Sequence, residues 1–67
     1  MRGTVVRVHK GELHEVEVTL AGTTRRVLAK MAGRLAVRRV RCVAGDRVEV
    51  VLNEYDPGRG RITARLP

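Results

Sequence analysis

Residues 45–65 carry the clearest pattern in the chain, and they read Gly45-Asp46-Arg47-Val48-Glu49-Val50-Val51-Leu52-Asn53-Glu54-Tyr55-Asp56-Pro57-Gly58-Arg59-Gly60-Arg61-Ile62-Thr63-Ala64-Arg65. The Gly-Asp pair predicts a tight turn that starts a strand, and a polar loop with proline and glycine leads into a second strand. Because successive side chains of a strand point to opposite faces, each strand has an inward set, namely Val48, Val50 and Leu52, and then Ile62, Ala64 and Leu66. Arg61 and Arg65 then point to solvent. The stretch therefore predicts two strands of a small β-barrel whose basic outer face suits a polyanion.

Three further strands are predicted upstream, over residues 4–8, 13–20 and 25–30. The second of them alternates almost completely, with Val16, Val18 and Leu20 inward and Glu15, Glu17 and Thr19 outward. In the first, Val6 and Val8 share one face and Val5 and Arg7 share the other; in the third, Val27 and Ala29 oppose Arg26, Leu28 and Lys30. Turns containing Gly11 and Gly22 join these strands into a meander.

Residues 31–37 break the alternation. The stretch 32–36 predicts a short helical turn or loop, weakened by Gly33, and 37–43 is a basic segment in which Arg39 and Arg41 could be the outer face of a strand. Three strands, a short helix or loop, and two more strands are the order of an all-β, five-stranded oligonucleotide/oligosaccharide-binding (OB) barrel. An SH3-like barrel is the alternative. Residues 1–67 are expected to form one domain.

Composition points to the kind of partner. The chain has 14 Lys+Arg against 7 Asp+Glu, a net charge of +7, and 12 of the basic residues are arginine, which contacts phosphate in a bidentate manner. Charge alone also fits an acidic protein or a membrane surface. No stretch is long and apolar enough to span a bilayer, and Met1-Arg2-Gly3 leads directly into a strand without a signal peptide. We therefore expect a cytoplasmic protein that does not bind a membrane.

Catalysis and metal binding have little support. Cys42 is the only cysteine, so an internal disulfide and the multi-cysteine zinc patterns are excluded. We expect its side chain in the core. His9 and His14 flank a turn, but a metal would need Glu12 or Glu15 as a third ligand. The chain contains no serine, the commonest hydrolase nucleophile. We therefore expect no enzyme, no cofactor and no metal site.

Two groups of arginines are the candidate binding residues. The first is Arg34, Arg38, Arg39 and Arg41 on the irregular connection, and the second is Arg59, Arg61 and Arg65 in the last loop and strand. Such a mobile basic loop can enter an RNA groove and neutralise phosphates, although solvated surface charge is the simpler explanation of any basic run. Tyr55 is the sole aromatic residue, so the chain lacks the stacking platform of cold-shock proteins, and a folded RNA is the better partner.

The sequence resembles bacterial translation initiation factor 1 from Gly3 to Arg65. The resemblance rests on Ala32-Gly33-Arg34-Leu35, Gly45-Asp46-Arg47-Val48, Tyr55-Asp56 and Gly60-Arg61-Ile62, in that order. It implies an OB barrel that binds the small ribosomal subunit at the decoding (A) site of 16S rRNA, with the loop after the third strand entering the decoding helix, and that assists the other initiation factors. By position, the resemblance implies that Arg34 and Arg41 take the loop function and that Arg59, Arg61 and Arg65 are further rRNA contacts. The full set of expected rRNA-binding residues is Arg34, Leu35, Arg38, Arg39, Arg41, Tyr55, Arg59, Arg61 and Arg65. This chain departs from the family at Ala36, Val37, Arg38 and Arg39, where two basic residues and Asn-Tyr are usual.

Three functions therefore follow from the sequence. The first is a monomeric initiation factor bound to rRNA of the small subunit. The second is a general RNA chaperone or antitermination module that binds single strands, and the third is a barrel whose basic face docks an acidic protein.

Overall fold

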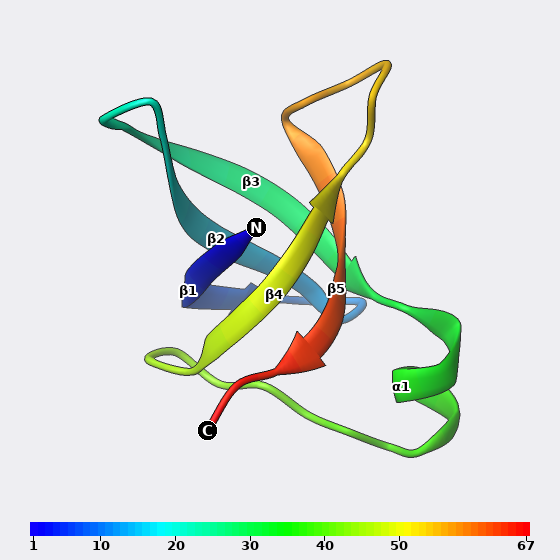
Figure 1. Ribbon diagram of the computed structural model, residues 1–67. Helices are drawn as coiled ribbons and strands as arrows, with labels where there is room; N and C mark the ends of the chain where they lie inside the picture. The colour runs from blue at the N-terminus through cyan, green and yellow to red at the C-terminus, as the bar shows by residue number, and fades with distance from the viewer.

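The computed structural model describes all 67 residues, and its five strands close into a barrel (Figure 1). In chain order the elements are β1 (Arg2–His9), β2 (Leu13–Leu20), β3 (Thr23–Met31), α1 (Gly33–Val37), β4 (Arg47–Leu52) and β5 (Arg59–Arg65). Around the barrel the order is β1-β2-β3-β5-β4, with β3 and β5 parallel and every other pair antiparallel. The expected all-β OB arrangement, with a short helix between the third and fourth strands, is confirmed.

Closure of the barrel depends on β1, which pairs with two strands at once. Gly3 lies opposite Val18 of β2 and also opposite Val48 of β4. The amino group of Met1 donates to the Val50 carbonyl oxygen at 2.8 Å and to the Glu49 carboxylate at 3.1 Å. The first residues therefore hold β1 against β4 and seal the barrel.

The core contains nine buried apolar residues, mostly valines on the inner faces of the strands. These are Val5, Val16, Val18, Val27, Ala29, Cys42, Val48, Val50 and Ile62. The prediction from alternation is confirmed for the inward pairs of β2, β3 and β4, and the expected core position of Cys42 is confirmed as well. β-branched side chains fill the narrow interior because they pack well on a pleated surface.

Four positions differ from simple alternation. A bulge after Val5 shifts the register of β1, so Val5 is buried whereas Val8 is 43% exposed. Leu20, expected inside, is 43% exposed because β2 has by then left the barrel for its hairpin turn. A second irregularity, between Glu49 and Val50 of β4 and opposite Thr63, leaves Ala64 only half-buried.

The segment after α1 is irregular, so the expectation that Arg39 and Arg41 lie on the outer face of a strand is wrong. The helix ends with two backbone bonds, from the Arg39 amide to the Ala36 carbonyl and from the Val40 amide to the Leu35 carbonyl, both 3.0 Å. This is a Schellman motif, whose turning residue has a positive φ, and Arg39 occupies that position with φ 57°. The chain is thereby turned away from strand geometry.

The β4–β5 loop, residues 53–58, forms at the other end of the barrel from α1 (Figure 1). Asn53 Oδ1 accepts the backbone amides of Tyr55 and Asp56, and Asp56 Oδ1 accepts the amide of Gly58. Asn53 and Asp56 therefore organise this turn. These side-chain caps replace the ladder bonds that the loop lacks.

Candidate nucleic-acid interface

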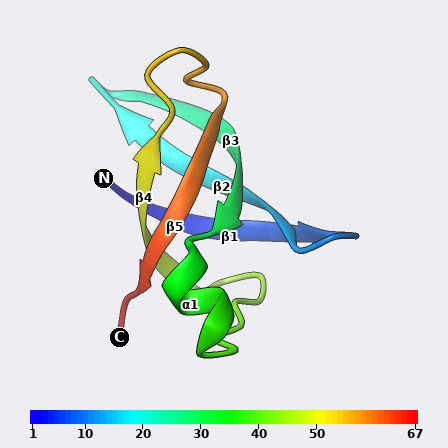
Figure 2. The same cartoon turned by 90° about the vertical axis from the view of Figure 1, so that its right-hand side faces the viewer.

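A shallow hollow of about 370 Å³ lies between α1 and the end of β5, and arginines surround it. Arg34 and Arg38 are four residues apart, so they share one face of α1, and Arg65 borders the hollow from β5. The Arg34 guanidinium donates to the Thr63 carbonyl oxygen at 3.4 Å, and the Ala32 amide donates to the Ile62 carbonyl at 2.9 Å. Figure 2 shows α1 beside the end of β5, so residues thirty apart in sequence form one basic surface.

Arg65 differs from the other arginines of this hollow because an acidic side chain lies close to its guanidinium group. Its Nη1 donates to the Arg41 carbonyl oxygen at 3.4 Å, and its Nε lies 3.7 Å from Asp46 Oδ2. Asp46 also accepts the Val43 amide at 2.9 Å. Arg65 therefore ties the irregular segment to β5, with part of its charge neutralised.

A second basic hollow, of about 350 Å³, lies at the start of β5 and is bordered by Arg59, Arg61 and Asn53. In the parallel pairing of β3 with β5, Arg61 lies opposite Lys30. Lys30 extends the positive surface across two strands. This position of Lys30 cannot be predicted from the sequence, because strand alternation contains no information about which distant strands pair.

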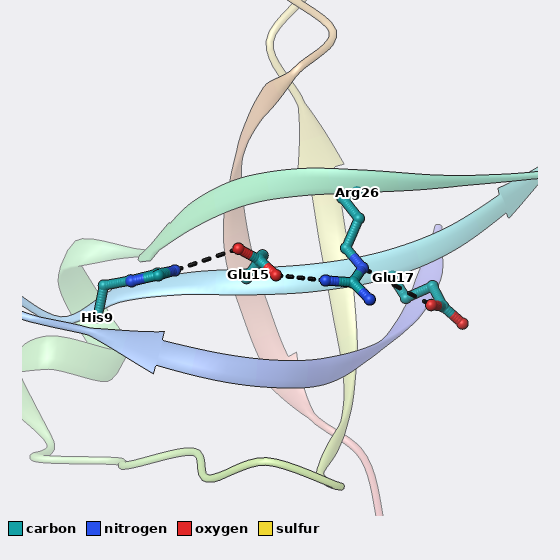
Figure 3. A network of polar contacts seen from close by, with 4 residues as sticks. All are labelled: His9, Glu15, Glu17 and Arg26. Carbon is teal, nitrogen blue, oxygen red and sulfur yellow. Dashed lines mark hydrogen bonds and ion pairs between the residues drawn. The ribbon is translucent and has the colours of Figure 1, made fainter.

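Two acidic residues of β2, Glu15 and Glu17, pair with basic side chains of β1 and β3. Arg26 donates to Glu15 at 2.5 Å and lies 3.8 Å from Glu17, and His9 Nε2 is 3.2 Å from Glu15 (Figure 3). The hydrogen bonds from His9 and then Arg26 lower the pKa of the Glu15 carboxyl, against the smaller opposing effect of burial. Arg26 and His9 are therefore paired with acidic residues on this face, whereas the arginines of α1 have no acidic partner.

Arginines without an acidic partner are the main electrostatic feature of α1, the segment after it and β5. No ion pair involves six exposed arginines of α1, the segment after it and β5, which are Arg34, Arg38, Arg39, Arg41, Arg59 and Arg61. Unpaired guanidinium groups attract phosphate strongly and contact it in a bidentate manner. The arrangement suits a polyanionic ligand.

The structure divides the nine residues expected at the site. It brings together Arg34, Leu35, Arg38 and Arg65 around the first hollow, and it places Arg59 and Arg61 at the second. Leu35 is half-buried and packs against the core, so it anchors α1. Arg39 and Arg41 follow α1 on the irregular segment. Tyr55 is 91% exposed in the β4–β5 loop, away from α1.

The geometry does not support a metal site or a reactive cysteine. No group of three or more His, Cys, Asp or Glu side chains is placed to hold a metal ion. Burial, and then the nearby Asp46 carboxylate, raise the pKa of the Cys42 thiol, so this cysteine is protonated and unreactive at neutral pH. No helix is long and apolar enough to cross a membrane.

Arg39 offers a prediction in which stability and binding change in opposite directions. A positive φ costs an L-residue about 1–2 kcal/mol, whereas glycine adopts it freely. Allowing for the greater freedom of glycine in the unfolded chain, Arg39→Gly should stabilise the barrel by about 0.5–1 kcal/mol and raise Tm by roughly 3–6 °C. Thermal unfolding followed by circular dichroism measures this.

The control for that prediction is Arg39→Ala, which removes the same charge and keeps the strained φ. It should not raise Tm, and an equal gain in both variants would show that charge relief, not backbone strain, is responsible. If the arginine contacts RNA, both variants should lose affinity equally. Backbone strain retained at a charged residue is typical of functional positions.

Sequence comparison identifies the relatives of the chain. No protein-family model matches it. A translation initiation factor IF-1 from Solibacter usitatus (strain Ellin6076) is 43% identical over 63 residues, which cover 94% of this chain and 83% of that protein. The chain belongs to the IF-1 family. The family predicted from the sequence motifs is thereby confirmed, and the chain is a translation initiation factor by descent.

Solved structures agree with the IF-1 assignment. The solution structure of the translation initiation factor IF-1 from the Wolbachia endosymbiont strain TRS of Brugia malayi matches with a TM-score of 0.73 and 26% identity, over 100% of this chain and 76% of that one. The crystal structure of YjeQ from Thermotoga maritima matches with a TM-score of 0.76 and 32% identity, over 98% of this chain but only 22% of that one. The barrel of the IF-1 family is therefore also similar to one part of a larger protein.

Proposed function

We propose that the chain binds the small ribosomal subunit during initiation, at the 16S rRNA of the decoding (A) site, and acts there with the other initiation factors. It does so by binding, as a monomer of one domain, without catalysis. The observation that carries the proposal is the set of unpaired arginines on α1, the segment after it and β5, in a member of the IF-1 family.

The geometry suits a folded RNA better than a single strand. Arg34 and Arg38 project from a one-turn helix at one end of the barrel, where they can reach phosphates on both sides of a groove. Single-strand binding without a fixed site relies on several aromatic side chains. Tyr55 is the only one here and lies in a different loop. We therefore favour the rRNA site over a general RNA chaperone, and Tyr55 would be a separate, weaker contact.

The test is binding of the purified protein to small ribosomal subunits at physiological salt, with chemical probing of the decoding helix. We expect saturable one-to-one binding and changed reactivity of the decoding-site bases. An excess of unstructured RNA should not displace the protein. Weak, non-saturating binding with no footprint, abolished by competitor RNA, would contradict the proposal and favour the chaperone.

Salt dependence provides a second prediction. If about five arginines each neutralise one phosphate, the logarithm of the binding constant should fall with the logarithm of salt concentration with a slope of roughly −4 to −5. Titrations at several potassium concentrations measure the slope. A slope near zero would mean that the arginines do not face phosphate, and it would favour docking on a protein through uncharged contacts.

A further inference from the structure

A third hollow, of about 250 Å³, lies between the β1–β2 hairpin and the segment after α1. Its walls are apolar and come from Val8, Met31, Val40 and Val43, and His14 and Cys42 border it from the core. Val8 is 43% and Val43 is 63% exposed, although most other valines of the barrel strands are buried. The two exposed valines therefore leave an apolar mouth that a ligand would cover.

His14 gives this hollow a directional polar group. The residue is only 3% exposed, and its Nδ1 lies 3.2 Å from the carbonyl oxygen of Ala29. A carbonyl oxygen can only accept, so Nδ1 carries the hydrogen, and in the neutral imidazole Nε2 is left as an acceptor.

The second ring nitrogen of His14, Nε2, faces the hollow. His14 Nε2 has no hydrogen-bond partner in the protein, yet no fully enclosed polar side-chain atom lacks a partner. Nε2 therefore remains in contact with open space, and the space that His14 borders is this hollow. Because Nε2 faces this open hollow and no protein group pairs with it, it is free to accept a hydrogen bond from a donor placed there.

The other residues that line the hollow limit the charge and size of the ligand that it can bind. The Cys42 thiol is neutral, and the charged residues at the edge, Glu12 and Arg41, are exposed to solvent. An apolar cavity of about 150 Å³ is enough to hold benzene, so a single aromatic ring fits the available volume. Apolar walls with one convergent polar group are typical of small-molecule sites.

We propose that this hollow binds a small aromatic molecule with one hydrogen-bond donor, of the phenol or indole type, whose donor pairs with His14 Nε2 while the ring packs on the valine walls. The site adjoins the Arg34–Arg38 hollow through Val40, but His14 is not among the expected rRNA-binding residues, so the proposal does not depend on ribosome binding. It assigns His14 as the residue that selects the ligand.

Phenol and anisole test the proposal, because they share a ring but only phenol has a donor. The isotope-labelled full chain is titrated with each at neutral pH and followed by NMR. Phenol should cause saturable shifts of the Val8, Met31, Val40 and Val43 methyl groups and of the His14 Nε2 nitrogen. Anisole should bind about five- to tenfold more weakly, the factor for one neutral hydrogen bond.

Protein variants provide the matched control. Val43→Asp places a charge at the mouth and should weaken phenol binding at least about tenfold, since the charge must be desolvated or the ring displaced. Val37→Asp is the same change at a residue of α1 that is 83% exposed and does not border the hollow, and it should leave binding unchanged. The proposal is overturned by the absence of saturable shifts, by equal affinity for phenol and anisole, or by equal effects of the two aspartates.

Discussion

Gly3→Ala should lower the free energy of unfolding by about 2–3 kcal/mol and Tm by roughly 10–20 °C, because the barrel leaves no room for a methyl group there. A Cβ at Gly3 would lie 2.6 Å from Val16 Cγ1, 2.8 Å from Val18 Cγ1 and 2.9 Å from the Glu17 carbonyl oxygen. Both valines are buried and β-branched, so they cannot rotate away. The strand itself must shift, and Gly3 lies where β1 pairs with both β2 and β4.

Gly33→Ala is the matched control for this prediction. A Cβ at Gly33 meets nothing within 4 Å, and the residue begins α1, where alanine is the better helix former. Its Tm should stay the same or rise. Thermal unfolding of both variants by circular dichroism decides the matter: if Gly3→Ala melts within about 2 °C of the parent, the closure of the barrel does not depend on this contact.

The pairing of β1 with both β2 and β4 shows how much of the fold can be predicted from the sequence. Alternation is a local property, so it correctly predicted five strands, a short helix and the inward valines at 16, 18, 27, 48 and 50. It could not predict which strands pair across the barrel, nor that Gly3 is required at the contact between β1 and its two neighbours. It also missed the bulge after Val5, because an extra residue shifts every later side chain to the other face.

The candidate site was predictable in its residue types and less so in its geometry. The predicted helical turn or loop over 32–36 included Arg34, but Arg38 was assigned to the basic segment after it. Their proximity to Arg65 depends on the packing of α1 beside β5, and the role of Lys30 depends on the parallel pairing of β3 with β5. The irregular path of Arg39 and Arg41 follows from a positive φ at an arginine, for which the sequence contains no signal such as glycine.

The double variant Arg34→Ala/Arg38→Ala should bind small ribosomal subunits roughly 100-fold more weakly, the effect of removing two charged hydrogen bonds of about 1.5 kcal/mol each. Both side chains are exposed, neither makes an ion pair, and their sole hydrogen bond is the 3.4 Å contact of Arg34 with Thr63. The barrel should therefore remain folded with nearly unchanged Tm. The salt slope of binding should become shallower by about 2, because each arginine that no longer neutralises a phosphate reduces the slope by about one unit.

Arg7→Ala/Arg25→Ala removes the same charge from β1 and β3, on residues that are also exposed and without ion pairs. If long-range attraction alone explained binding, the two double variants would weaken it equally, because net charge falls from +7 to +5 in each. We expect instead less than about threefold loss for the control, since general attraction is screened beyond roughly 8–10 Å at physiological salt whereas direct contact is not. Equal losses would remove α1 from the binding surface and leave the basic barrel as a non-specific polyanion binder.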